Sequence, residues 1–179
     1  MTSIGQAPRS MRTLLAMIPT RPLSELDRRA GRAVRDAVGR RPEMLQAAQV
    51  GSAAFAPAFR IAVAVAVLDR DTRREGLNAL LSAGTAAGVA LLARDAIGRP
   101  RPGDRRDAGF PSRHAAAGAA IAASASKGTG AGAALWLGTA LGSACRVATG
   151  EHEVGDVVAG AALGVLVATS VNALARAGR

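Results

Sequence analysis

The sequence is poor in the side chains on which many binding and redox proteins rely. Aromatic residues make up 2% of the 179 residues and tyrosine is absent, so the stacking platforms of single-strand nucleic-acid binders are missing. The single cysteine, Cys145, excludes an intramolecular disulfide and a thiolate metal cluster. Only two histidines are present, His114 and His152. Histidine chemistry, if there is any, therefore depends on these two positions.

Positive charge and apolar residues are abundant instead. The net charge is +10 and 49% of the residues are hydrophobic. Basic charge favours a polyanionic partner. Together with long apolar runs, it indicates a lipid headgroup or an anionic membrane surface, and we expect no nucleic acid. The basic residues are nearly all arginine, with Lys127 the one lysine, a composition that looks actinobacterial.

Three long windows of the sequence contain no charged residue. Residues 76–93 and 128–145 are 18 residues each, and residues 157–175 are 19. A membrane-spanning helix needs about 20 mostly apolar residues, within a range of roughly 17–25. Two weaker segments are 44–68, interrupted only by Arg60, and the short 115–126. We therefore predict an all-α, multi-pass transmembrane helix bundle of five spans. A soluble all-α bundle with alanine-rich core helices is the alternative.

The segment before the first span has a different pattern. Apolar residues recur at helical spacing between arginines, at Leu23, Leu26, Ala30, Ala33, Val34, Ala37 and Val38. Ser24 and Asp27 have the spacing of a capping box at a helix start, and Gly39 is a natural stop. This pattern predicts an amphipathic helix in the membrane interface, with an ordinary solvated helix as the alternative. The predicted organisation is thus an N-terminal tail and interfacial helix over 1–43, and a transmembrane domain over 44–179.

Two clusters of polar residues flank the third predicted span. Residues 94–102 follow the second span and contain Arg94, Arg99 and Arg101, whose guanidiniums could hold a phosphate by forked contacts or merely anchor a helix end. Residues 110–114 contain Ser112 and His114 at a helix start, where free backbone N–H groups favour an anion. A capped helix with an interfacial histidine is the simpler interpretation of that second cluster.

A third cluster, residues 145–156, joins the fourth and fifth spans. His152 and Asp156 are four residues apart, so one helical turn brings the carboxylate against the imidazole. A carboxylate that holds one ring nitrogen leaves the other free as a nucleophile or base. With five alternating spans, all three clusters lie on the same side of the membrane. The topology therefore predicts that they meet.

The three clusters resemble the signature motifs of the type 2 phosphatidic acid phosphatase superfamily. That pattern is Lys, six residues, Arg-Pro; then Pro-Ser-Gly-His; then Ser-Arg, five residues, His, three residues, Asp. The matching positions are Arg94, Arg101 and Pro102, then Pro111, Ser112 and His114, and finally Arg146, His152 and Asp156. The match covers residues 94–156, and the combined spacing is highly specific.

The resemblance implies a membrane lipid phosphatase, and it implies a role for each matching residue. His152 would attack phosphorus and become a phosphohistidine, Asp156 would orient it, and His114 would protonate the leaving alkoxide. The implied phosphate-binding residues are Arg94, Arg101, Ser112 and Arg146. The family generally needs no metal, and we expect neither a metal nor a cofactor.

Three positions depart from the family pattern. Arg94 replaces lysine, Cys145 replaces serine and Arg113 replaces glycine. Arg113 is the most consequential change, and we count it among the phosphate-binding residues. It would add a contact to the cleaved phosphate, crowd the site, or hold a second anionic group on the substrate. A non-catalytic member that binds lipid phosphates is the alternative that Arg113 and Cys145 raise.

The substrate expectation rests on a narrower resemblance. The small size, the Ser-Arg-His variant and the composition are similar to decaprenylphosphoryl-5-phosphoribose phosphatases of cell-wall arabinan synthesis. Phosphatidylglycerol phosphate and polyprenyl phosphates or diphosphates stay open as substrates, and the oligomeric state is open too.

The distribution of basic residues predicts the sidedness. The catalytic side has nine that are not site residues: Arg28, Arg29, Arg32, Arg35, Arg40, Arg41, Arg99, Arg105 and Arg106. The opposite side has six: Arg70, Arg73, Arg74, Lys127, Arg176 and Arg179. Because cytoplasmic loops carry the excess of Lys and Arg, we expect the catalytic face of this plasma-membrane protein in the cytoplasm.

Overall fold

The computed structural model describes residues 21–102, 108–125 and 130–177. The tail before Arg21 lies outside these residues, as do Arg105, Arg106, Lys127 and Arg179 from the sidedness count. The described residues form six helices: α2 (Arg21–Gly39), α3 (Pro42–Leu68), α4 (Arg73–Ile97), α5 (Arg113–Ser124), α6 (Gly130–Ala148) and α7 (Val154–Ala177). The only β-pairing among them is an isolated bridge between Pro100 and Ala108. The all-α prediction is confirmed.

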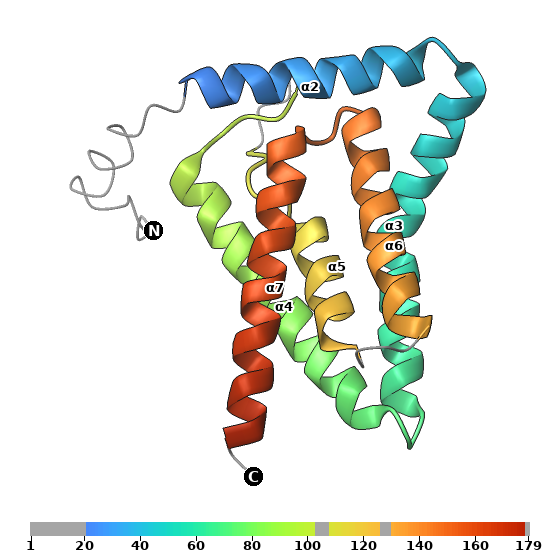
Figure 1. Ribbon diagram of the computed structural model, residues 1–179, viewed down its shortest axis with the longest axis vertical. Helices are drawn as coiled ribbons and strands as arrows, with labels where there is room; N and C mark the ends of the chain where they lie inside the picture. Colours follow the sequence, from blue (N-terminus) through green and yellow to red (C-terminus); the bar gives the residue numbers. More distant parts are fainter. Residues whose placement is uncertain (1–20, 103–107, 126–129, 178–179) are drawn as a thin grey trace, which may run out of the picture.

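The helices α3 to α7 run side by side as a bundle, and α2 lies across one end of it (Figure 1). Within the described residues, α3, α4 and α7 are long and apolar enough to cross a membrane. Helix α5 has 12 residues, about 18 Å, which is shorter than the roughly 30 Å of bilayer hydrocarbon. It packs mainly against α7 and α4, and most of its alanines are buried. Full crossing by α5 and α6, which the five-span prediction requires, stays a prediction.

Two glycines bring α5 and α7 close together. A Cβ at Gly160 would collide with the carbonyl oxygen of Ser112, and one at Gly164 with that of Ala116. Glycines four residues apart are the usual means by which membrane helices approach closely. The approach lets the backbone N–H of Ser112 donate to the carbonyl oxygen of Asp156 at 2.8 Å. The start of α5 is thereby fixed against the start of α7.

Helix α2 forms where the amphipathic pattern predicts it, but its start differs from the prediction. It already includes Arg21, so Ser24 lies inside the helix and is not its N-cap. The Asp27 side chain points to the bundle, as described below, instead of capping. On the outer face, Leu26 is 61% exposed and Val34 36% exposed. An outward apolar stripe is the surface that an interfacial helix presents to lipid.

Candidate active site

The ends of four helices converge beneath α2. Helices α4 and α6 end there, and α5 and α7 begin there (Figure 1). Nε of Arg94 donates to the carbonyl oxygen of Pro111 at 3.0 Å, which joins the first and second clusters. Nη1 of Arg101 donates to the carbonyl oxygen of Glu151 at 3.0 Å, which joins the first and third. The three clusters meet at one end of the bundle, as the alternating topology predicts.

His152 and Asp156 form a buried pair at the start of α7. Nδ1 of His152 lies 3.3 Å from Oδ2 of Asp156, and both residues are 0% exposed. The same carboxylate oxygen accepts a hydrogen bond from the Glu153 N–H at 3.0 Å, which fixes its orientation. A carboxylate at Nδ1 favours the tautomer with the proton on that nitrogen. Nε2 is buried and has no hydrogen-bond partner among the described residues, so its lone pair is available.

The protonation state of His152 suits a nucleophile. Burial lowers the pKa of His152 below its usual value of 6.5, although the hydrogen bond and the charge of Asp156 oppose that shift. At neutral pH the ring is therefore mostly uncharged. An uncharged imidazole with one nitrogen held is the form that can attack an electrophile.

An arginine beside this pair already holds an anion. Arg146 is 7% exposed and forms an ion pair with the carboxylate of Glu151. Ser52 donates to the same carboxylate, and Thr149 lies within hydrogen-bond distance at 3.4 Å. Burial raises the pKa of Glu151, but the Ser52 hydrogen bond and Arg146 outweigh it and the pKa is lowered. The Glu151 carboxylate stands in for an anionic ligand at Arg146.

His114 faces this cluster from the first turn of α5. Its ring lies beside Phe55, with 6.5 Å between the centroids, and Nδ1 is buried without a hydrogen-bond partner among the described residues. Burial lowers the pKa of His114 to about 4, and the positive charges of Arg146 and Arg113 contribute. Without an anionic ligand the ring is neutral at pH 7. A bound dianion would raise that pKa, because opposite charge favours the imidazolium.

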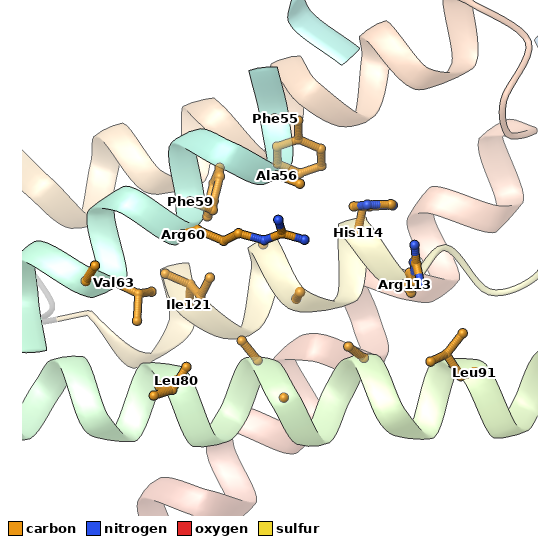
Figure 2. Close-up of a pocket in the computed structure, with 16 residues that line it drawn as sticks. Phe55, Ala56, Phe59, Arg60, Val63, Leu80, Leu91, Arg113, His114 and Ile121 are labelled. Atoms are coloured by element: carbon orange, nitrogen blue, oxygen red, sulfur yellow. The ribbon is translucent and has the colours of Figure 1, made fainter. Parts of the chain in front are cut away.

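Two cavities meet at His114. A polar cavity of about 470 Å³ is lined by Gln49, Ser52, Ala53, Ala56, His114, Arg146, Thr149 and Glu151. An apolar cavity of about 460 Å³ lies between α3, α4 and α5, and its wall includes Phe59, Leu80, Leu91 and Ile121 (Figure 2). His114 and Ala56 line both. The arrangement can take an amphiphile with its anionic end at Arg146 and its apolar part between the helices.

Two of the residues that the sequence predicts to bind phosphate, Ser112 and Arg113, do not line the polar cavity. The Ser112 hydroxyl is fully buried and accepts from the Ala115 N–H at 3.4 Å as the N-cap of α5, and the residue lines neither cavity. Arg113 is exposed and lines the apolar cavity, not the polar one around Arg146. Their direct contact with a phosphate stays a prediction.

A second set of charged residues contacts the His152–Asp156 pair through Asp27 and Arg99, in contacts that the sequence did not predict. Asp27 of α2 accepts from the Gly155 N–H at 2.7 Å and forms an ion pair with Arg99. Nη1 of Arg99 lies 3.4 Å from Oδ1 of Asp156, so charge contacts run from α2 to the His152 partner. The one signal in the sequence is that Asp27 and Arg35 lie eight residues apart on one helical face.

The Arg35 side chain completes this link to α2. Its Nη1 and Nη2 donate to the two carboxylate oxygens of Glu153 at 3.2 and 3.3 Å. Such a forked pair is geometrically specific. Helix α2 therefore contacts the chain around His152 at two points, Glu153 in the loop and Gly155 in the first turn of α7.

Among the described residues, no group of three or more His, Cys, Asp and Glu side chains is placed to hold a metal ion. The expectation of chemistry without a metal stays a prediction.

Comparison with known proteins relates the fold to solved structures. No protein-family model and no curated protein matches the chain. A PAP2-type transmembrane phosphatidylglycerolphosphate phosphatase from Bacillus subtilis superposes with a TM-score of 0.72 at 23% identity, covering 93% of this chain and 92% of that one. LpxE from Aquifex aeolicus superposes with a TM-score of 0.68 at 19% identity, covering 80% and 92%. The chain has the fold of these two proteins over most of its length.

Proposed function

We propose that the chain is a membrane lipid phosphatase of the PAP2 type, which hydrolyses a phosphate monoester through a phosphohistidine. The observation that carries this proposal is the buried His152–Asp156 pair, whose free Nε2 lies in one cluster with Arg146 and His114. The sequence motifs over residues 94–156 and the shared fold support it.

The first chemical step forms the covalent intermediate. The Nε2 lone pair of His152 attacks phosphorus, and the bond from phosphorus to the lipid oxygen breaks with its electron pair on oxygen. His114, protonated once the phosphate dianion is bound, gives its proton to that oxygen, and the lipid alcohol leaves. Arg146 and Arg101 offset the charge on the phosphoryl oxygens, the largest kind of stabilisation in such reactions.

The second step releases phosphate. Neutral His114 takes a proton from water as the water oxygen attacks phosphorus. The N–P bond breaks, its electrons return to His152, and inorganic phosphate leaves. Asp156 keeps the His152 ring in one tautomer throughout, as the acidic partner does in other histidine-dependent enzymes.

For the substrate, we propose phosphatidylglycerol phosphate first. The Bacillus subtilis protein of the same fold is by its description a phosphatidylglycerolphosphate phosphatase. Decaprenylphosphoryl-5-phosphoribose stays the second candidate, because of the Ser-Arg-His variant of the third motif and the arginine-rich composition. Both lipids carry a terminal phosphate monoester and a retained phosphodiester.

Phosphate release from a panel of lipids tests the function. Purified protein in mixed micelles should release phosphate from phosphatidylglycerol phosphate, phosphatidic acid and a polyprenyl phosphate at unequal rates. Vanadate should inhibit, since it mimics the five-coordinate phosphorus of the transition state, and EDTA should not. Release from none of the lipids would favour a non-catalytic lipid-binding protein, and a loss in EDTA that magnesium restores would contradict a metal-free site.

We also propose that the catalytic end faces the cytoplasm. The excess of arginines on and near α2 supports this sidedness. A cysteine placed at Asp71, between α3 and α4 in a variant with Cys145→Ala, should react with a membrane-impermeant maleimide in intact cells. A cysteine at Arg40 should not react until the cells are opened. The reverse pattern would invert the orientation.

A further inference from the structure

A lone arginine lies deep in the membrane part of α3. Arg60 is the nineteenth residue of the 27-residue helix α3 and is exposed on its surface. At 1.5 Å per residue, its Cα lies about 12 Å further into the bundle than that of Ser52, which contacts the site. A charge at such depth is costly, and arginines that persist there face a cavity or a partner. An anion near Arg60 would therefore offset the cost of placing this charge at such a depth.

The side chain of Arg60 turns toward the active site. Helical side chains lean toward the N-terminus of their helix, and α3 begins at the catalytic end. In Figure 2 the Arg60 guanidinium lies across the apolar cavity, between Phe59 and His114. The nearer end of α3, at Leu68, lies in the opposite direction, so the charge does not reach that interface by snorkelling.

No acidic side chain among the described residues of the cavity wall neutralises this charge. The residues that line the apolar cavity include Arg60, Arg113 and His114, and the described lining has no Asp or Glu. The remaining lining is apolar or glycine. The cavity is thus shaped for an apolar chain with a negative group near its catalytic end. Leu80 and Leu91 of α4 line the cavity and are themselves exposed on the surface of the bundle.

We propose that Arg60 and Arg113 form a second anion site, which binds the retained phosphodiester of a lipid whose terminal phosphate monoester is cut at His152. This inference rests on the proposed function and adds a determinant of substrate class to it. The terminal phosphate occupies the polar cavity, the hydrocarbon chain lies in the apolar cavity, and His114 stands where the two meet. A lipid with only one phosphate, such as phosphatidic acid, leaves the second anion site unused.

The test compares two diacylglycerol lipids that differ in the retained phosphodiester. The ratio of kcat/KM on phosphatidylglycerol phosphate to that on phosphatidic acid is measured in mixed micelles. Arg60→Gln and Arg113→Gly should each lower the ratio about 10- to 100-fold, the range for a lost charge-assisted hydrogen bond. Arg60→Lys should keep more of it. Arg70→Gln, a matched change in the exposed turn after α3, should leave the ratio as it is.

A binding measurement on the same preparations separates this inference from the proposed function. Native mass spectrometry measures retention of phosphatidylglycerol, which has the phosphodiester but no monoester, against diacylglycerol, which has neither. Arg60→Gln should weaken retention of phosphatidylglycerol about tenfold or more relative to diacylglycerol. If the wild type hydrolyses no lipid, the proposed function is wrong. The retention of phosphatidylglycerol would still show whether Arg60 binds a phosphodiester. An unchanged rate ratio with unchanged retention would overturn the second anion site.

Discussion

Replacement of His152 by alanine is expected to lower kcat on every lipid phosphate by about 10⁴-fold or more, as loss of a nucleophile does in other covalent enzymes. The reason is that the Asp156 carboxylate holds Nδ1 of His152, which leaves the Nε2 lone pair of this residue to attack phosphorus. Phosphate release from phosphatidylglycerol phosphate under single-turnover conditions measures the change.

The control for this variant concerns folding, because His152 is 0% exposed and its removal leaves a cavity. His152→Gln keeps most of the volume and should be equally inactive. Both variants should bind vanadate weakly but still unfold cooperatively in detergent. Activity above a tenth of wild type in a folded His152→Gln protein would remove His152 from the role of nucleophile.

Replacement of His114 by alanine is expected to have the second largest effect, and the effect should depend on the leaving group. Loss of a general acid costs about 10²–10⁴-fold. Lipid alkoxides are poor leaving groups and should show the full loss. The release of p-nitrophenolate from an aryl phosphate needs no proton, so its first step should be nearly as fast as in the wild type. Equal losses on both substrates would mean that His114 only binds the phosphate.

The pH dependence of kcat/KM provides a second check on the same residue. The reacting complex has His114 protonated and His152 neutral, whereas in the free enzyme the pKa of His114 is about 4 and that of His152 is below 6.5. As pH rises, the protonated fraction of His114 falls, and as pH falls, the neutral fraction of His152 falls. The wild-type optimum for lipid substrates should therefore lie on the acidic side of neutrality. His114→Ala should lose the decline on the alkaline side.

The parts of the site that the sequence predicts are those set by local spacing and by topology. His152 and Asp156 pair because they are four residues apart, and Arg94, Arg101 and Arg146 gather because alternating helices return their ends to one side. The all-α fold follows in the same way from uncharged windows near the length of a bilayer span. The site and the fold could be predicted to this extent because each depends on a pattern within one segment or on the number of spans between segments.

The parts that the sequence does not predict depend on contacts between distant positions. The Asp27–Arg99 ion pair joins residues 72 apart, and the Arg35–Glu153 pair joins residues 118 apart, with no periodic signal between them. The capping-box spacing of Asp27 instead suggested a local role, which was wrong. Because the docking angle of α2 decides these contacts, they emerge only when the whole bundle is packed.

Glu151 is the other site residue that the sequence did not predict. An acidic side chain within an anion-binding motif suggests a solvated loop residue, because it would repel the anion. In the structure its carboxylate engages Arg146 and Ser52 from within the polar cavity. Its position follows from the turn between α6 and α7, where Gly150 has a φ of 72° that favours glycine.

Location of the trapped phosphate tests the central claim most directly. His114→Ala protein with ³²P-labelled aryl phosphate should accumulate the phosphoenzyme, because the base for its hydrolysis is missing. Rapid quench, alkaline digestion and peptide mass spectrometry should place the label on His152, as a base-stable, acid-labile phosphohistidine. Label on Ser112 or Cys145, or turnover of the aryl phosphate with no labelled protein at any time, would contradict the account.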